Sequence, residues 1–135
     1  MKVLLDINVV LDVVLGREPW VAHSAAVLSA ADEGRLKAWV TGHTLTTVHY
    51  VTAANRDRVA ATSAVVELLR FLDVVPVEAH DFHRALTLDL PDFEDAVQAA
   101  CALKVGADYL VTRNEKDFPG LACQVVPPGA LLAML

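Results

Sequence analysis

The feature that most constrains this chain is the alternation of short apolar runs with longer helical patterns. The run Val3 to Leu5 ends at Asp6, which is typical of a buried parallel strand with an acid at its carboxyl end. Further strand-like runs cover residues 36–41, 73–77, 108–112 and 123–126. Helical patterns cover residues 8–15, 21–33, 45–54, 58–72, 79–88, 93–105 and 128–135. This order predicts a three-layer α/β domain with a central, mostly parallel sheet of four to five strands flanked by helices.

Single residues refine these elements. Pro76 lies in the third apolar run, and proline confines such a strand to a sheet edge or a strand end. The run at 123–126 is expected to form the last edge strand. Thr44 is expected to cap the helix over 45–54, and Gly106 to end the helix over 93–105.

Length and composition limit the class of protein. A chain of 135 residues, 55% of them hydrophobic, suffices for one domain with its own core, spanning residues 1–135. Charged residues interrupt every apolar run well before the roughly 20 residues of a membrane span, and no signal-peptide pattern precedes Asp6, so we expect a cytoplasmic protein. The net charge of -6 disfavours indiscriminate binding to nucleic acid, so any such site must be local. Cys101 and Cys123 have no metal-binding spacing and are expected to be buried.

Acidic and polar side chains cluster at three places where a parallel sheet would form a site. Ligands bind outside the carboxyl ends of parallel strands, and the predicted topology brings the three clusters to that edge. They are Asp6 with Asn8, Asp92 with Glu94 and Asp95, and the segment from Thr112 to Phe118. Carboxylates gathered there would raise one another's pKa unless a cation lay between them. Oxygen ligands without His or Cys favour Mg²⁺ or Mn²⁺ over zinc, and such an ion suits phosphodiester hydrolysis by a metal-activated water.

Each cluster alone has an ordinary structural explanation. Asp6 is equally suited to capping the first helix. Asp92 and Asp95 lie one turn apart on one face at the start of a helix, where negative charge is favourable, while Glu94 points elsewhere. Thr112 to Phe118 is compatible with a simple loop. Only the combination of acids at three successive site-forming positions favours a metal site.

Three ordered motifs also resemble a known family. Residues 4–12 (Leu-Leu-Asp-Ile-Asn-Val-Val-Leu-Asp) resemble the opening signature of PIN domains, residues 95–102 their third acidic motif, and residues 110–118 their closing motif. The resemblance implies a metal-dependent endoribonuclease that uses Mg²⁺ or Mn²⁺. For a small single-domain member it also implies the toxin of a VapBC-like toxin–antitoxin pair, with RNA as substrate and an antitoxin encoded nearby. The apolar helical faces over residues 21–28 and 59–69 are expected to be mostly core, with part left for a homodimer interface or the antitoxin.

The resemblance assigns individual site residues. Asp6 and Asp95 match the metal-holding aspartates, and either Asn114 or Asp117 completes the site. The family's usual second-motif glutamate falls at Thr47 here; this resembles a subgroup with Thr-Leu-Thr-Thr-x-x-Tyr at 44–50 and an Asp-Phe-Glu-Asp third motif. Asp92 is expected to replace the missing charge. The expected catalytic residues are therefore Asp6, Asp95 and Asp117, with Asp92 and Asn114 as further metal ligands.

Basic and polar residues near this edge are candidates for contacting substrate. Arg113 is the strongest, because a guanidinium can bind a phosphate through two hydrogen bonds; its alternative role is pairing with Asp92 or Glu94. Asn8, Thr112 and Lys116 are the other expected substrate-binding residues. His43, on the helix that also carries Thr47, is expected to have a packing or surface role.

Two other functions compete with the ribonuclease hypothesis. In the first, Asp6 forms an aspartyl phosphate, as in receiver domains or haloacid-dehalogenase-like phosphatases. The second acid that those phosphatases usually require falls at Asn8 here. In the second alternative, Thr47 marks a weakened site, and the domain binds a partner or RNA without cleaving it.

Overall fold

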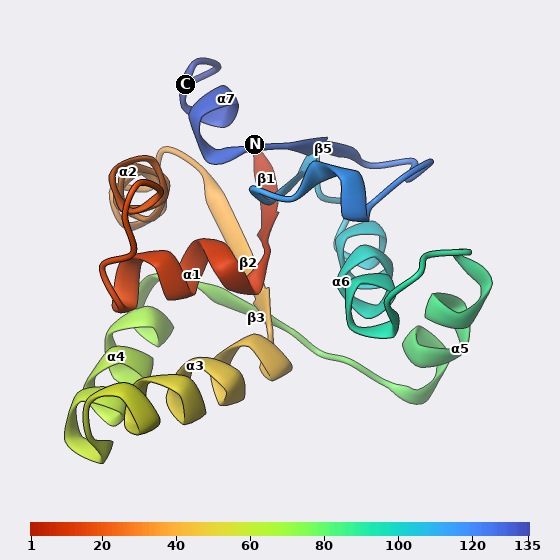
Figure 1. Ribbon diagram of the computed structural model, residues 1–135. Helices are drawn as coiled ribbons and strands as arrows, with labels where there is room; N and C mark the ends of the chain where they lie inside the picture. The colour runs from red at the N-terminus through yellow and green to blue at the C-terminus, as the bar shows by residue number, and fades with distance from the viewer.

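The protein is a three-layer α/β domain, described over all residues 1–135 by a computed structural model (Figure 1). Five parallel strands form one sheet in the order β3-β2-β1-β4-β5. The strands are β1 (Lys2–Leu5), β2 (Lys37–Thr41), β3 (Asp73–Val75), β4 (Tyr109–Val111) and β5 (Gln124–Val126). The predicted fold class is confirmed. Both edge-strand predictions are confirmed as well, since β3 and β5 are the outer strands and Pro76 directly follows β3.

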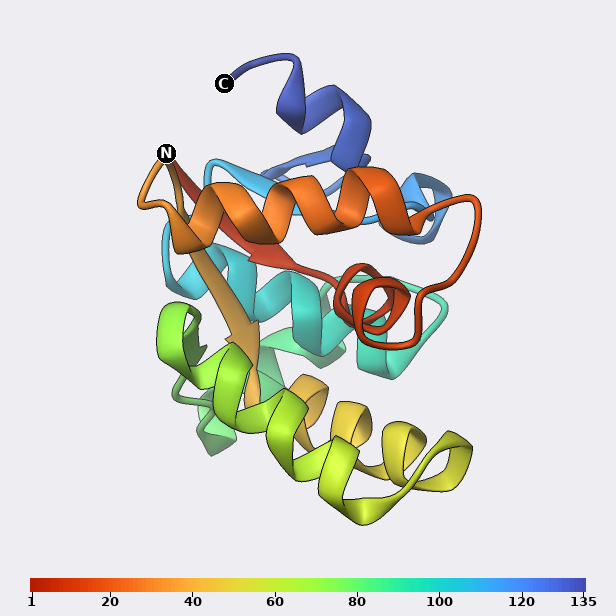
Figure 2. The ribbon, with the colours of Figure 1, turned by 90° about the vertical axis from the view of Figure 1, so that its left-hand side faces the viewer.

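Helices cover both faces of the sheet. They are α1 (Ile7–Val14), α2 (Val21–Asp32), α3 (Gly42–Asn55), α4 (Arg58–Phe71), α5 (Ala79–Thr87), α6 (Phe93–Lys104) and α7 (Pro128–Leu132), with a 3₁₀ turn η1 (Glu115–Asp117). The helices α1 to α4 lie on one side and α5 and α6 on the other (Figure 1). Viewed from the first side, α2 crosses above α1, and α3 and α4 form a hairpin below it (Figure 2).

The core explains why β1 is apolar on both faces. Val3 and Leu5 join the larger hydrophobic cluster with α1 and α2, whereas Leu4 joins a second cluster with α6. All three side chains are fully buried. A central parallel strand with helices on both sides has no solvent face, so it cannot alternate between apolar and polar residues. Cys101 and Cys123 are free thiols buried in the second cluster, as predicted.

One predicted helix start was wrong. Helix α3 begins at Gly42, and its cap is Thr41, whose hydroxyl accepts a hydrogen bond from the Thr44 amide at 3.2 Å. Thr44 lies inside the first turn, fully buried. Because Thr41 also ends β2, the chain passes from strand to helix without a loop.

The carboxyl ends of the strands form the edge where the candidate site lies. The Asp6 amide donates to the Val111 carbonyl at 2.9 Å, which fixes the ends of β1 and β4 side by side. The first turns of α1, α3 and α6 open at this same edge (Figure 1). None of the helices is long and apolar enough to span a bilayer.

Candidate active site

Asp6 is a buried carboxylate fixed by two hydrogen bonds. Its exposed fraction is only 4%. One carboxylate oxygen accepts from the Ile7 amide at 2.8 Å and the other from the Thr112 hydroxyl at 2.8 Å. Asp6 therefore caps α1 and also faces the site, so the two roles considered for it are compatible. Burial raises its pKa, the two hydrogen bonds oppose that rise, and the charges of Glu94 and Asp117 add to it.

Asp95 lies in the first turn of α6, close to the other acids. The Asp92 side chain caps this helix by accepting from the Asp95 amide at 2.9 Å. Burial and, after it, the negative charges of neighbouring acids together raise the pKa of Asp95 to about 7. In decreasing order of effect, these neighbours are Asp92, Asp6, Asp117 and Glu94. The structure thus brings together the acids from the three clusters.

No Lys or Arg side chain pairs with these acids. The ion pairs of the chain lie elsewhere, apart from one between Glu94 and His43, whose atoms Oε2 and Nε2 are 3.3 Å apart. A divalent cation would relieve the repulsion, and the donors are the carboxylate oxygens that Mg²⁺ and Mn²⁺ prefer. No three Asp, Glu, His or Cys side chains already stand in metal-binding geometry. Mg²⁺ takes only one or two carboxylates directly and keeps several waters, so the donor set fits it without a preformed cage.

Thr112 has a different role from the expected one. We predicted a substrate contact, but its side chain is fully buried. Its hydroxyl donates to Asp6 and accepts from the Asn114 amide at 3.0 Å, so its only donor is used within the protein. Thr112 therefore positions Asp6. The Asn114 carbonyl in turn accepts from the Asp117 amide at 3.0 Å, which connects this turn to the third acid.

Arg113 binds an acid that the sequence interpretation did not consider. Its guanidinium makes two hydrogen bonds to the fully buried Asp12 of α1, at 2.9 and 3.3 Å, and lies 3.8 Å from the centroid of the Trp20 ring. The alternative role as partner of Asp92 or Glu94 was therefore wrong. Of the other expected substrate contacts, Asn8 is half-buried in α1 and Lys116 is exposed in η1, and neither side chain is engaged in a hydrogen bond.

Glu94 and His43 are the site residues that the sequence interpretation missed. Glu94 was expected to point away, yet its charge raises the pKa of both Asp6 and Asp95. His43 lies on α3, and its Nε2 atom pairs with Glu94. The same nitrogen lies 3.5 Å from the hydroxyl of Thr47, the residue at the position of the family's usual second-motif glutamate. The first turn of α6 thus places an additional acid beside α3. The Asp-Phe-Glu-Asp motif already contains Glu94 as an acid. Its position beside His43 of α3 becomes clear only from the folded structure.

Comparison with known proteins identifies the family. The sequence model of the PIN domain matches residues 2–116, most of the chain. The chain belongs to the PIN domain family. This confirms the resemblance seen in the three motifs. The PIN domain is also 26% identical over 122 residues to a protein from Aquifex aeolicus (strain VF5) named ribonuclease VapC1, an alignment that covers 87% of this chain and 83% of that protein.

Solved structures share the fold of this PIN domain. A toxin–antitoxin complex from Klebsiella pneumoniae contains a chain with a TM-score of 0.71 at 21% identity, covering 93% of this chain and 97% of that one. VapBC2 from Rickettsia felis, bound to a promoter DNA fragment, gives a TM-score of 0.70 at 16% identity with the same coverages. The sarcin–ricin-loop-cleaving toxin VapC20 of Mycobacterium tuberculosis gives 0.65 at 14% identity, covering 80% and 86%.

Proposed function

We propose that this PIN domain is a metal-dependent endoribonuclease and the toxin of a VapBC-like toxin–antitoxin pair. The observation that carries the proposal is the gathering of Asp6, Asp95 and Asp117 at the carboxyl edge of the sheet with no basic partner. Family membership and the ribonuclease named among its relatives support the same activity. We expect the protein to act in the cytoplasm.

Asp6, Asp95 and Asp117 are the residues we propose as holders of Mg²⁺ or Mn²⁺. Bound there, the ion would supply activation of a water and neutralisation of charge on the phosphate. Glu94 is better suited than Asp92 to replace the missing second-motif acid, because its charge acts on both Asp6 and Asp95 and an Asp92 oxygen already caps α6. Asn114 remains a candidate ligand through its side chain.

The chain's other residues orient the acids and the substrate. Thr112 and the Ile7 amide fix both oxygens of Asp6, so that its direction is set before any ion or substrate binds. Asn8 and Lys116 are proposed to contact the RNA strand, since their side chains are not engaged elsewhere. We propose that Arg113 contributes positive charge from its place on Asp12, where its side chain keeps an exposed fraction of 21%.

The proposed partners follow from the relatives. Several solved structures with this fold are complexes with antitoxins or VapB proteins, so we propose that an antitoxin encoded nearby binds this chain. A homodimer is proposed as the state of the free protein. The reading frame next to the gene is a direct check, because it should encode a short DNA-binding antitoxin.

The decisive experiment is RNA cleavage by the purified protein. We expect cleavage that EDTA abolishes, that added Mg²⁺ or Mn²⁺ restores, and that Asp95→Asn removes. If neither EDTA nor Asp95→Asn changed the rate of RNA cleavage, the proposal would be refuted. Intact folding without Mn²⁺ binding in calorimetry would instead favour a non-catalytic binding module. Beryllofluoride trapping tests the alternative of an aspartyl phosphate on Asp6, and we expect it to give no adduct.

A further inference from the structure

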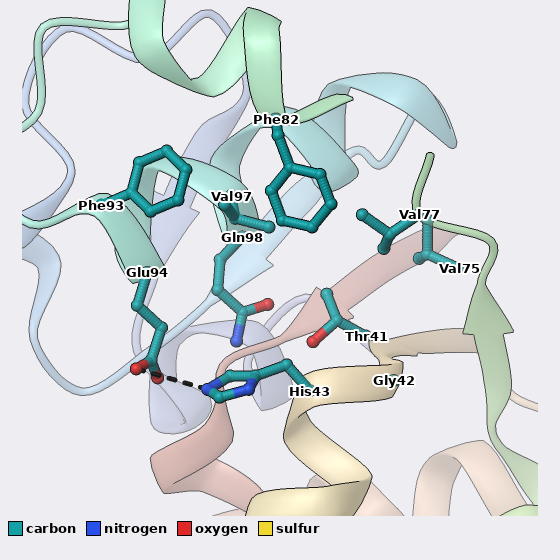
Figure 3. Close-up of a pocket in the computed structure, with 10 residues that line it drawn as sticks. All are labelled: Thr41, Gly42, His43, Val75, Val77, Phe82, Phe93, Glu94, Val97 and Gln98. Carbon is teal, nitrogen blue, oxygen red and sulfur yellow. Dashed lines mark ion pairs between the residues drawn. The ribbon is translucent and has the colours of Figure 1, made fainter. Parts of the chain in front are cut away.

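A mostly apolar pocket adjoins the acidic edge, beneath the first turn of α6. Its volume is about 450 Å³, within the range of small-molecule sites. The start of α3, the segment after β3, α5 and α6 all contribute to its wall (Figure 3). The only acidic or basic side chains lining it are Glu94 and its partner His43. The pocket therefore suits a largely neutral, flat group better than a phosphate.

Two phenylalanine rings stand at this pocket on adjacent helices. Phe82 of α5 and Phe93 of α6 have centroids 6.4 Å apart and planes inclined by 29°. Their exposed fractions are 43% and 49%, so part of each ring is open to solvent. Both rings border the cavity, and Val97 lies between them in the view of Figure 3. Exposed aromatic faces of this kind are what unpaired RNA bases stack on.

The wall of the pocket also holds an acceptor without a donor. Gln98 has an exposed fraction of 2%, and its Nε2 donates to the Thr44 hydroxyl at 3.3 Å. Its Oε1 has no hydrogen-bond partner in the protein. The carboxamide extends from α6 into the space between Phe82 and His43 (Figure 3). A buried acceptor of this kind is unfavourable until a donor reaches it, and the soft terminal torsion of Gln lets the oxygen turn toward a ligand.

Glu94 connects this pocket with the acidic edge. It lines the pocket and at the same time raises the pKa of Asp6 and Asp95. A phosphate held at those acids would thus have its neighbouring nucleotide beside the pocket mouth. This adjacency favours RNA over a peptide as occupant, because one strand would fill both places.

We propose that this pocket receives an unpaired nucleobase next to the phosphate to be cleaved, an inference that rests on the proposed ribonuclease function. The base stacks on Phe93 or Phe82, and one of its amino or ring N–H groups donates to Oε1 of Gln98. The enzyme would then read single-stranded RNA with a base preference at one position beside the cut.

The test separates binding from cleavage. Binding is measured by fluorescence anisotropy with labelled single-stranded RNA oligonucleotides of mixed sequence, intact or with one abasic position, in the full chain carrying Asp95→Asn so that the RNA is not cut. We expect Phe93→Ala to weaken binding about 10-fold and Phe82→Ala by a similar factor. Removing the base should weaken binding to the parent by the same factor. In Phe93→Ala, removing the base should cause no further loss of affinity. Tyr50→Ala, an exposed aromatic outside the pocket, is the control and should leave binding unchanged.

Gln98→Met tests the acceptor separately. It keeps the side-chain length and removes both the orphan oxygen and the 3.3 Å hydrogen bond from Nε2 to the Thr44 hydroxyl. These two losses have opposite effects on stability, so the free protein should melt close to the parent while RNA binding weakens. In the chain with Asp95 intact, both Gln98→Met and Phe93→Ala should flatten the base preference at one position beside the cut.

The outcomes distinguish this inference from the proposed function. If the parent cuts RNA in an EDTA-sensitive way but the ring and Gln98 substitutions change neither affinity nor preference, the pocket proposal is overturned and the ribonuclease proposal stands. If no RNA is cut, the ribonuclease proposal fails, while the anisotropy still decides whether the pocket holds a base. If the substitutions spare RNA binding and instead release the protein encoded by the adjacent reading frame from a co-expressed complex, the pocket is a protein-docking site and the inference is overturned.

Discussion

The two ends of helix α6 handle buried negative charge in opposite ways. At its last turn, Lys104 lies 2.7 Å from the buried Asp81, whose other contacts include the Glu78 amide at 2.8 Å. The Lys104 ammonium and that amide hold the pKa of Asp81 below its usual range. At the first turn, Asp95 and Asp6 have no basic partner, and burial together with neighbouring acids raises the pKa of each.

The difference separates a structural acid from a functional one. An acid matched with its own lysine completes the fold and leaves nothing for a ligand to do. Acids left unmatched destabilise the fold at neutral pH, which is tolerable if a cation taken from solution supplies the missing charge. Perturbed pKa values of this kind concentrate at functional sites. The first turn of α6 is therefore the end at which we expect chemistry.

The largest expected effect comes from neutralising the unmatched acid. Asp95→Asn should lower RNA cleavage by about 1000-fold, since it removes a carboxylate that holds the ion. The same change should raise the melting temperature of the metal-free protein at about pH 8, because it removes a repelled charge. Cleavage rates and thermal melts measured on the same preparation give both numbers.

Asp81→Asn is the matched control at the other end. It leaves Lys104 without its buried partner, so the melting temperature should fall while cleavage per folded molecule stays near that of the parent. If the melting temperature fell for both Asp95→Asn and Asp81→Asn, the two ends of α6 would not differ in how they accommodate negative charge.

Added cation should stabilise only the unmatched end. At 100 times its dissociation constant, Mn²⁺ should stabilise the folded protein by about 2.7 kcal/mol. The stabilisation should disappear in Asp95→Asn and persist in Asp81→Asn. Thermal melts with and without EDTA measure it, and an equal shift in all three proteins would indicate binding elsewhere.

The two ends should also differ in their pH dependence. The folded-state pKa of Asp95 is about 7, above its ordinary value, so its ionisation costs stability progressively as the pH rises from about 4 through 7. Asp95 is partly exposed and solvent screens its charge, so we expect a loss of about 2 kcal/mol or less over this range. The lowered pKa of Asp81 acts the other way: its contribution is complete above the ordinary Asp pKa and is lost only as the pH falls through the folded value.

Urea titrations of the metal-free protein between about pH 5 and pH 8 check this prediction. The free energy of unfolding should decline toward high pH in the parent and more shallowly in Asp95→Asn. In Asp81→Asn the whole curve should lie lower with the parent's slope. If the free energy of unfolding of the parent rose with pH, the claim that ionisation of Asp95 costs stability would be contradicted.

The acids at the first turn of α6 were predictable from sequence, because they depend on local patterns, whereas the pairing of Asp81 with Lys104 was not predicted. The apolar run at Val3 to Leu5 ending in Asp6 fixed a central strand with an acid at its carboxyl end, and parallel topology placed Asp95 at the same edge. Helix-start chemistry identified the position of Asp95 but not its surroundings. Family membership, confirmed by the match over residues 2–116, rests on the same three motifs.

What escaped prediction depends on which elements pack together. Thr41 and Thr44 are equally good caps in sequence, and only the direct passage from β2 to α3 selects Thr41. Arg113 finds Asp12 because α1 turns that acid inward, toward the loop after β4. Glu94 meets His43 only because the starts of α3 and α6 open at one edge, and no spacing within either segment encodes that contact.

The smallest effect we predict distinguishes Asp92 from its neighbour Glu94. An Asp92 oxygen already caps α6, so Asp92→Ser keeps the cap and removes a charge that, of Asp6 and Asp95, acts on Asp95 alone. Cleavage should change by about threefold or less, since the charge acts on Asp95 but not on Asp6. Glu94→Gln removes a charge that acts on both acids, and it should lower cleavage and Mn²⁺ affinity about 10-fold.

Parallel cleavage assays and Mn²⁺ calorimetry on these two variants decide between the acids. If Asp92→Ser has the larger effect, Asp92 supplies the charge missing at Thr47, as the sequence suggested, and Glu94 only holds His43. If Glu94→Gln has the larger effect, the unmatched end of α6 contributes two successive acids to the site. The contrast with the matched end would then be sharper, because Lys104 balances the acids beside it within the fold, whereas Glu94 and Asp95 together require a cation from solution.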